Sequence, residues 1–348
     1  MSKRLAGNWL IALSIVAILV GAPGGGVAKA TVVKANKVKQ IAIATPEKAT
    51  DYGWNQQGVQ GARAAANAFG AKLVVDQGIG YNNTESVLRR LATGGANFII
   101  AHASGYATVA PRIAQQYKVP IIVYDFPKTV VKGLVSDVET SSQQGSYLAG
   151  IVAASKTKTG TLGLVLSAGD PNWYKQSGGF IAGARSVRKN VKFVREQIGP
   201  AAYDDAAGGK RVAQAVIAAG ADVFFGMGDG SSFGYLSAAE TAKAGHKVWF
   251  IDVIGNKTPI DTHHVLLSSV LWDFAPTFKK IITDINNGTF GTHYYNLTAA
   301  NGISLLRTPY IPANVWNLVE RDRHQISAGM IHIPLTTTNA AVHKLCSC

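Results

Sequence analysis

Short apolar runs alternate with small-residue helical segments along most of this chain, and the whole alternation occurs twice. The first half contains predicted strands at 40–44, 71–76, 96–101 and 119–125, with predicted helices at 56–66, 85–92 and 109–117. The second half contains predicted strands at 161–166, 191–194, 221–225 and 247–252, with predicted helices at 180–185 and 209–219. Strands and helices that alternate at this spacing indicate parallel sheets covered by helices on both faces. The sequence therefore predicts an α/β protein.

The two halves also resemble each other in local sequence. Gly-Ala-Arg occurs at 61–63 and again at 183–185, and Gly-Ala-Asn-Phe at 95–98 corresponds to Gly-Ala-Asp-Val at 220–223. Two similar units without a long linker suggest two lobes that face each other across a cleft. Chance similarity between segments rich in Ala and Gly is the alternative explanation.

The order of elements predicts where the chain changes lobe. We expect an N-terminal lobe of residues 38–139 plus 272–305, a C-terminal lobe of 140–271 plus 306–338, and a tail of 339–348. Crossings near 140, 272 and 306 would form a three-stranded hinge.

The first 30 residues have the pattern of a cleaved secretory signal peptide. Lys3 and Arg4 precede an apolar run at 9–22, and a small-residue stretch ends in Ala28-Lys29-Ala30. The apolar run is shorter than the ~20 residues of a membrane-spanning helix. No Cys follows the run, so no lipid anchor is expected, and the mature protein is predicted to be exported to the periplasm or the extracellular space.

Charge and cysteine content narrow the classes of partner. The net charge is +14, but Lys and Arg are scattered and no nucleic-acid-binding motif is present. We therefore expect a solvated basic surface and no nucleic-acid partner.

The two cysteines, Cys346 and Cys348, can form a small-ring disulfide, pair with another chain or stay free, so the core must hold the fold without a disulfide framework.

A polar loop at 45–55 follows the first predicted strand and is the first candidate for ligand binding. It contains Asp51, Tyr52, Gly53, Trp54 and Asn55. In open α/β sheets, ligands bind beyond the carboxyl ends of the strands, where such loops lie. An aromatic face with a few directed polar groups suits a planar ligand. The alternative is that Trp54 packs under the loop and Asp51 caps the helix.

The second half has the same arrangement, because Trp173 also precedes a predicted helix. Elsewhere the chain shows no nucleophile elbow, phosphate-binding loop or metalloprotease motif. His263 and His264 are adjacent, so on an extended segment they point to opposite faces, and no metal site or cofactor is predicted. Asp125, Asp229 and Asp252 each follow a predicted strand, where they can bind a ligand or cap the next helix.

Several of these segments together resemble the basic membrane protein family, the purine- and nucleoside-binding receptors of bacterial ABC importers. The resemblance covers about 39–306 and is carried by five stretches: Asp-Tyr-Gly-Trp-Asn at 51–55, Gly-Ser-Tyr-Leu-Ala-Gly at 145–150, Thr-Gly at 159–160, Phe-Ile-Ala-Gly-Ala at 180–184, and Gly-Ala-Asp-Val-Phe-Phe at 220–225. It implies a type I periplasmic-binding-protein fold, with two Rossmann-like lobes that close on the ligand.

The resemblance also implies roles for individual residues. Trp54 would stack on a base and Asn55 would hydrogen-bond to it, with Asp51 beside them. Phe225 would be the second aromatic, and Asp252 would bind ribose hydroxyls. The remaining candidates for ligand contact are Tyr106, Trp173, Gly228, Gly230 and Trp272.

The chain departs from the family pattern at two places. Trp272 stands where members often have Lys near the hinge, and Val253-Ile254-Gly255 replaces an acid-rich motif. Both changes weaken the expectation of ribose binding and are compatible with a free purine base.

These observations predict a monomeric, extracytoplasmic binding protein that captures a purine nucleoside or base and delivers it to an ABC permease, without enzyme activity. An exported nucleoside hydrolase that uses Asp252 and Asp229, and a sensory binding protein for another small ligand, are the alternatives.

Overall fold

The computed structural model describes residues 37–348. The predicted signal peptide at 1–30 lies outside the described residues. Within 37–348, no helix combines the length and apolar character needed to cross a membrane.

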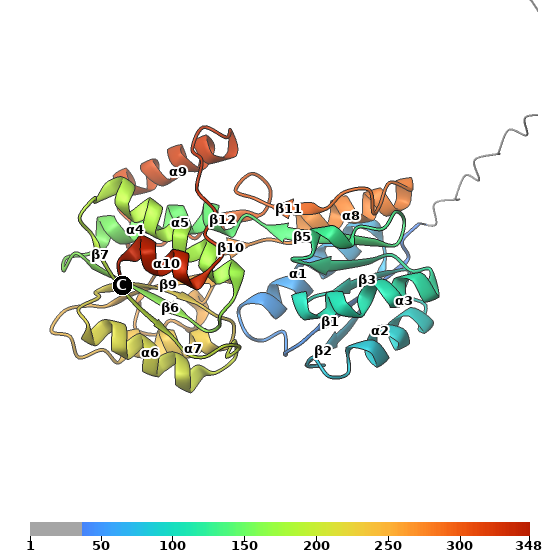
Figure 1. Cartoon of the computed structure of the whole chain (residues 1–348), viewed down its shortest axis with the longest axis horizontal. Coiled ribbons are helices and arrows are strands. Elements are labelled where there is room, and N and C mark those ends of the chain that lie inside the picture. Colours follow the sequence, from blue (N-terminus) through green and yellow to red (C-terminus); the bar gives the residue numbers. More distant parts are fainter. Residues whose placement is uncertain (1–36) are drawn as a thin grey trace, which may run out of the picture. The chain divides into compact units, whose positions relative to one another are not determined.

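The first sheet has six strands in the order β11-β5-β4-β3-β1-β2, and all neighbours are parallel. Its strands are β1 (Gln40–Thr45), β2 (Lys72–Gln77), β3 (Phe98–Ala101), β4 (Ile121–Tyr124), β5 (Val135–Thr140) and β11 (Tyr295–Leu297). One face packs against α1 (Trp54–Phe69) and α8 (Ala275–Asn287), and the other against α2 (Thr84–Thr93) and α3 (Ala110–Tyr117) (Figure 1). Two short 3-10 turns, η1 (Ser104–Thr108) and η2 (Pro127–Thr129), follow β3 and β4.

The second sheet repeats this plan with the order β12-β10-β9-β8-β6-β7. Its strands are β6 (Thr161–Leu166), β7 (Lys192–Gln197), β8 (Val223–Met227), β9 (Trp249–Ile254), β10 (Leu266–Trp272) and β12 (Ile303–Leu305), the last antiparallel to β10. Helices α4 (Ser142–Lys156) and α5 (Pro171–Val187) cover one face, and α6 (Ala206–Ala218) and α7 (Ser231–Glu240) cover the other. The turn η3 (Thr258–Ile260) follows β9.

Side-chain alternation explains why central strands such as β1, β3 and β4 are almost entirely apolar. On β1, Ile41 and Ile43 pack toward α1 and α8, whereas Ala42 and Ala44 pack toward α2 and α3. A strand buried on both faces needs apolar residues at every position, which is the continuous pattern of the sequence. The predicted fold class, two α/β lobes built on parallel sheets, is confirmed.

The chain passes between the two sheets three times: after β5, after β10, and between β11 and β12. The first two passages lie near the predicted crossings. The third lies earlier than the predicted one near 306, because β12 already pairs with β10 in the second sheet. Such a short strand pair at a sheet edge carries little apolar pattern of its own.

Several elements were not expected from the sequence. Helix α5 begins at Pro171, well before the predicted start at 180, because Asp170 caps it through the backbone N–H of Asn172. Strand β5 and helix α7 were not predicted. Helices α9 (Ala313–Ser327) and α10 (Asn339–Cys346) were also missed, and they pack against α4 and α5. The last helix ends in a disulfide between Cys346 and Cys348.

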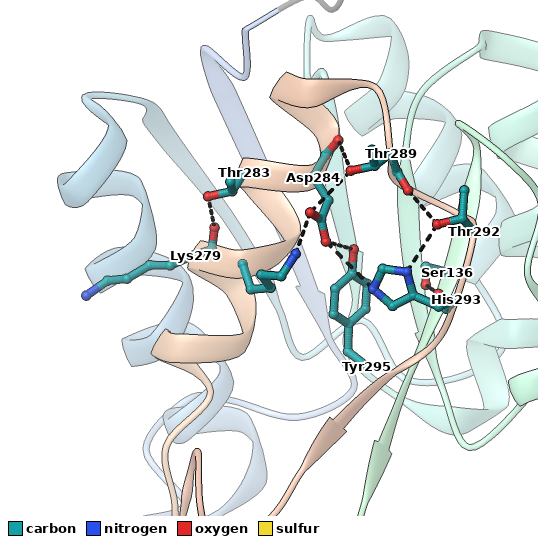
Figure 2. Close-up of polar contacts among 9 residues, drawn as sticks. Ser136, Lys279, Thr283, Asp284, Thr289, Thr292, His293 and Tyr295 are labelled. Atoms are coloured by element: carbon teal, nitrogen blue, oxygen red, sulfur yellow. Dashed lines mark hydrogen bonds and ion pairs between the residues drawn. The ribbon is translucent and has the colours of Figure 1, made fainter. Parts of the chain in front are cut away.

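A polar cluster around Asp284 fixes α8 to the strands at the edge of the first sheet (Figure 2). The Asp284 carboxylate accepts hydrogen bonds from Lys280 Nζ at 2.5 Å and from the Tyr295 hydroxyl of β11 at 2.9 Å. His293 Nε2 lies 3.7 Å from the same carboxylate, and the His293 carbonyl accepts from the Ser136 hydroxyl of β5. Burial raises the pKa of Asp284, but its hydrogen bonds outweigh that effect and hold it below the usual range.

Glycines allow α4 and α5 to pack unusually closely. A Cβ at Gly183 would lie 1.9 Å from the Tyr147 carbonyl oxygen, and a Cβ at Gly150 would lie 2.2 Å from the Phe180 carbonyl oxygen. Both obstacles are backbone atoms, which cannot move without shifting a whole helix. The glycines shared with the family pattern at these positions therefore serve helix contact.

Gly183→Ala is expected to destabilise the protein by about 1–3 kcal/mol or more, because the new methyl overlaps the facing backbone. The direction of the change in stability distinguishes a crowded position from an open one, because Gly→Ala inside an unobstructed helix stabilises a protein by roughly 0.5–1 kcal/mol. Urea unfolding measures the effect, and Ala182→Ser, at a half-buried neighbour, is the control. A Gly183→Ala protein at least as stable as the wild type would contradict the close approach.

Candidate functional site

The loop after β1 is held in shape by the side chain of Asp51. Its carboxylate accepts hydrogen bonds from the backbone N–H groups of Gly53, Asn55 and Gln56, at 3.1, 2.9 and 2.9 Å, and from Asn55 Nδ2 at 2.9 Å. Asn55 Nδ2 also lies 3.2 Å from Glu47 Oε2. Asp51 and Asn55 are therefore buried in the loop and orient the start of α1, instead of lining a cavity as predicted.

Trp54, the first residue of α1, lies in an aromatic cluster at the ends of β1, β3 and β4. Its ring stacks on His102 with centroids 4.2 Å apart, and its Nε1 donates to the His102 carbonyl at 2.9 Å. Tyr124, Trp272 and Phe274 approach the indole edge-on. One face of Trp54 is thus already covered by protein.

His102 was missed by the sequence analysis, although it follows a predicted strand on the same sheet edge as Trp54. Its Nε2 lies 2.9 Å from the Trp54 carbonyl oxygen and its Nδ1 lies 2.7 Å from the Tyr124 hydroxyl. Complete burial lowers the pKa of His102 to about 3, so the ring is neutral at physiological pH. Gly58 is required beneath it, because a Cβ there would lie 2.2 Å from the imidazole.

Loops from both sheets surround one cavity, which together with its open mouth encloses about 560 Å³ of space. Its lining contains five large aromatic side chains and four carboxylates together with small and apolar residues. The lining residues are Pro46, Glu47, Trp54, Tyr81, Ala103, Ser104, Asp125, Asp170, Asn172, Trp173, Tyr203, Asp229, Ile254 and Trp272. Three of the predicted site residues, Trp54, Trp173 and Trp272, are therefore brought together.

Trp173 and Trp272 reach the cavity from the second sheet. Trp173 lies in the first turn of α5, and its Nε1 donates to the Ser167 hydroxyl at 3.0 Å. Trp272 ends β10, is 2 % exposed, and its Nε1 has no hydrogen-bond partner among the described residues. A buried indole N–H without a partner carries a desolvation cost that a hydrogen-bond acceptor on a ligand can relieve.

The four carboxylates differ in how they are held. Asp170 accepts from the Tyr203 hydroxyl at 2.8 Å, and Asp125 accepts from Asn172 Nδ2 at 3.0 Å. Burial raises the pKa of Asp125 to about 6 and that of Glu47 to about 7. Burial, reinforced by neighbouring acids, also raises the pKa of Asp229.

The backbone at this edge adopts left-handed conformations at non-glycine residues. Tyr52, Asp125 and Ile254 have φ of +50°, +60° and +71°. Such residues are uncommon, and they concentrate at binding and catalytic sites. Tyr52 and Asp125 lie in loops at this end of the strands and Ile254 ends β9, and Asp125 and Ile254 line the cavity itself.

Asp252 does not line the cavity. Its carboxylate forms an ion pair inside the second lobe. Lys257 Nζ lies 2.7 Å from Asp252 Oδ2, and both side chains are fully buried. The same ammonium donates to the Tyr52 carbonyl of the first loop at 3.2 Å. A Cβ at Gly255 would lie 1.8 Å from that carbonyl oxygen, so the loop packs directly on the turn after β9. Asp252 therefore helps to fix the first loop against the second lobe.

The other predicted residues lie outside the cavity. Tyr106 is buried and donates to the Gly80 carbonyl at 2.7 Å. Phe225 is also buried and stacks on Phe180 of α5 at 5.0 Å, because alternation on β8 turns it toward that helix.

The two glycines after β8 do not line the cavity and lie against polar side chains. A Cβ at Gly228 would lie 2.0 Å from the Ser231 hydroxyl oxygen, and a Cβ at Gly230 would lie 1.9 Å from Asp204 Oδ1. Within the described part of the chain, no group of three or more His, Cys, Asp or Glu is placed to bind a metal. His263 instead lies 3.4 Å from Glu240.

Lys257→Met is expected to lower the free energy of unfolding by about 3–5 kcal/mol, because it leaves the buried Asp252 carboxylate without a counter-charge. The matched control, Arg89→Met, breaks an exposed pair with Glu85 and should cost less than about 1 kcal/mol. Urea denaturation compares the two. Equal, small effects would contradict the buried contact.

The ligand-free protein is expected to lose stability as pH rises from about 4.5 to about 7, in part because of Glu47. The pKa of Glu47 is higher in the folded protein than in the unfolded chain, so the folded state binds more protons across this window and stability falls with pH. Melting temperatures measured across this range should fall less steeply for Glu47→Gln than for the wild type. Identical slopes would contradict the raised pKa.

Comparisons with known proteins show the family and the fold to which this chain is similar. The family model described as ABC transporter substrate-binding protein PnrA-like matches residues 38–303. The ABC transporter nucleoside-binding protein BmpA of Lactococcus lactis subsp. cremoris (strain MG1363) is 25% identical over 360 aligned positions, which cover 96% of this chain and 99% of that protein. The transcriptional activator protein med of Bacillus subtilis (strain 168) is 23% identical, with 75% of this chain and 80% of that protein covered.

Solved structures show the same fold. A solute-binding protein of an ABC transporter system from Conexibacter woesei DSM 14684 superposes with a TM-score of 0.72 at 20% identity, covering 85% of this chain and 99% of that one. One from Aeropyrum pernix K1 gives a TM-score of 0.72 at 18% identity, covering 88% and 96%. Since the family model matches well over half of the chain, this protein belongs to the Bmp family of ABC transporter substrate-binding proteins.

Proposed function

We propose that this protein captures a purine base or purine nucleoside in the cavity between its two sheets and delivers it to an ABC permease. The observation that carries the proposal is the convergence of Trp54, Trp173 and Trp272 on one cavity from different elements. Indole rings offer large flat faces, and base–aromatic stacking contributes about 1–3 kcal/mol per base in nucleic-acid-binding proteins. A heterocycle of purine size suits such a site.

Polar groups among these rings favour a purine over a purely apolar ring. Trp272 Nε1, which has no partner within residues 37–348, is a donor for a ring nitrogen or carbonyl oxygen, and the carboxylates accept from ring or exocyclic N–H groups. Purines carry both kinds of group on their edges. The relative from Lactococcus lactis, whose name describes a nucleoside-binding protein, supports the same ligand class.

The choice between base and nucleoside turns on where ribose hydroxyls would bind. Asp252, the residue that the family resemblance assigned to ribose, is paired with Lys257 and does not line the cavity. A nucleoside would need another acceptor, and Asp170 or Asp229 is available in the lining. The sequestration of Asp252 favours the free base.

Transport requires the protein to work outside the cytoplasmic membrane. We propose that residues 1–30 direct export and are removed, and that the mature monomer presents its ligand-bound form to the permease. In this proposal, the lobes built on the two sheets move relative to each other about the three crossings, and ligand contacts to both lobes shift an open–closed equilibrium toward the closed state. Loss of labelled purine uptake on deletion of the gene tests the transport step.

Titration with adenine, hypoxanthine, adenosine and inosine, followed by tryptophan emission and melting temperature, tests the binding step. Trp272→Phe keeps an aromatic side chain but removes the indole N–H and part of the ring, so purine affinity should fall by about tenfold or more, the value of one buried hydrogen bond together with some lost ring contact. Because Trp272 is buried, the substitution also leaves a small cavity, and a melting curve of the ligand-free variant checks that it remains folded. Trp249→Phe, outside the cavity lining, is the matched control. Unchanged emission and melting temperature with every purine would overturn the proposal.

A further inference from the structure

We propose that the cavity selects ligands by charge: it prefers heterocycles that carry a positive charge or several N–H donors, and it rejects anionic nucleotides. This inference rests on the proposed purine-binding function and narrows its ligand class. N-alkylated, cationic purines are the ligands that the site fits best.

The cavity is lined by acids without a compensating base. Four of its lining residues, Glu47, Asp125, Asp170 and Asp229, carry carboxyl groups, and no Lys, Arg or His is among the described residues that line it. The negative potential of these groups acts in a partly enclosed space, where charge interactions are stronger than in bulk water. A ligand phosphate would meet repulsion there.

The nearby lysines are engaged elsewhere. Lys257 Nζ is fixed between Asp252 Oδ2 and the Tyr52 carbonyl, at 2.7 and 3.2 Å. Lys175 Nζ donates to the Thr140 carbonyl at 3.2 Å. Neither side chain lines the cavity. Lys175 lowers the pKa of Asp125 and Lys257 that of Asp229 through their charge, but burial outweighs both effects, so a positively charged ligand would add to an incomplete compensation.

Two buried polar atoms of lining residues lack a protein partner, which separates this site from a surface cluster of acids. Asp229, 7 % exposed, has no hydrogen-bond partner at Oδ1 within residues 37–348, and Trp272 has none at Nε1. Buried polar groups are nearly always hydrogen-bonded in native proteins. A ligand that satisfies both atoms must offer an N–H donor or a positive charge to Asp229 Oδ1 and a hydrogen-bond acceptor to Trp272 Nε1.

The aromatic walls favour the same ligand. Trp54, Trp173, Tyr81 and Tyr203 all line the cavity. The negative faces of such rings attract cations, with gains of about 0.5–2 kcal/mol per contact. A cationic purine ring therefore gains from stacking on these walls and from the carboxylates at its edge.

The raised pKa values of two lining acids indicate that the protein supplies too little positive charge to stabilise their ionised forms. Burial raises the pKa of Glu47, with further contributions from Asp204 and Asp51. Burial also raises the pKa of Asp229, to which Asp51, Glu47 and Asp204 add and which Lys257 opposes. A cationic ligand replaces the protons that these groups otherwise retain.

Three ligands with one ring system test the proposal: adenosine, the cationic 1-methyladenosine, and the anionic adenosine 5′-monophosphate. Calorimetric titration of the full mature chain should give an affinity about tenfold higher for 1-methyladenosine than for adenosine, and about tenfold lower for the monophosphate. Binding of 1-methyladenosine should also release protons, measured by repeating the titration in buffers of different ionisation enthalpy.

Asp229→Asn keeps the size of the side chain and removes its charge, so the preference for 1-methyladenosine should shrink to about threefold or less. Glu47→Gln is a second variant in case the first fails to fold, which a melting curve detects. Glu240→Gln, an acid outside the cavity lining, should leave all three affinities unchanged.

The outcomes separate this inference from the function on which it rests. Adenosine binding with equal or tighter binding of the monophosphate, or with no gain for 1-methyladenosine, overturns the charge selectivity and leaves the purine proposal standing. Failure of all three ligands to bind, together with failure of the free bases adenine and hypoxanthine, overturns both.

Discussion

The contact between the first loop and the turn after β9 is the interaction on which the arrangement of the site depends. Lys257 is buried between the Asp252 carboxylate and the Tyr52 carbonyl, and Gly255 lets the two backbones touch. The charge pair is worth little as a source of stability, because desolvation offsets most of its attraction. Its consequence is geometric, since it fixes the loop that carries Trp54 against the lobe that carries Trp173 and Trp272.

The parallel topology explains why so many functional groups meet at this place. Carboxyl ends of neighbouring parallel strands lie at one edge of a sheet, so the residues that follow them converge there. His102 follows β3, Asp125 follows β4, Asp229 follows β8 and Trp272 ends β10. The strained backbone at Asp125 and Ile254 is tolerated because the buried strands beneath it are rigid.

Rigid support beneath the site comes from close helix packing. Gly150 and Gly183 bring α4 and α5 into backbone contact, and α5 begins with the turn that carries Trp173. The cluster around Asp284 similarly ties α8 to β11 and β5, next to a passage of the chain between the sheets.

The sequence by itself determined the fold class, because strands buried on both faces must be apolar at every position and their alternation with helices leaves few topologies. It also singled out Trp54 and Trp173, since a bulky aromatic in a polar loop after a strand is a local signal, whereas Trp272 was named only through the resemblance to the family. Tertiary structure alone decided the partners of each polar group. Local pattern gave no indication that Asp51 and Asn55 would be turned into the loop, that Phe225 would face α5, or that Lys257 would neutralise Asp252. Those outcomes depend on side chains that are far apart in the chain and meet only when the two sheets are in place.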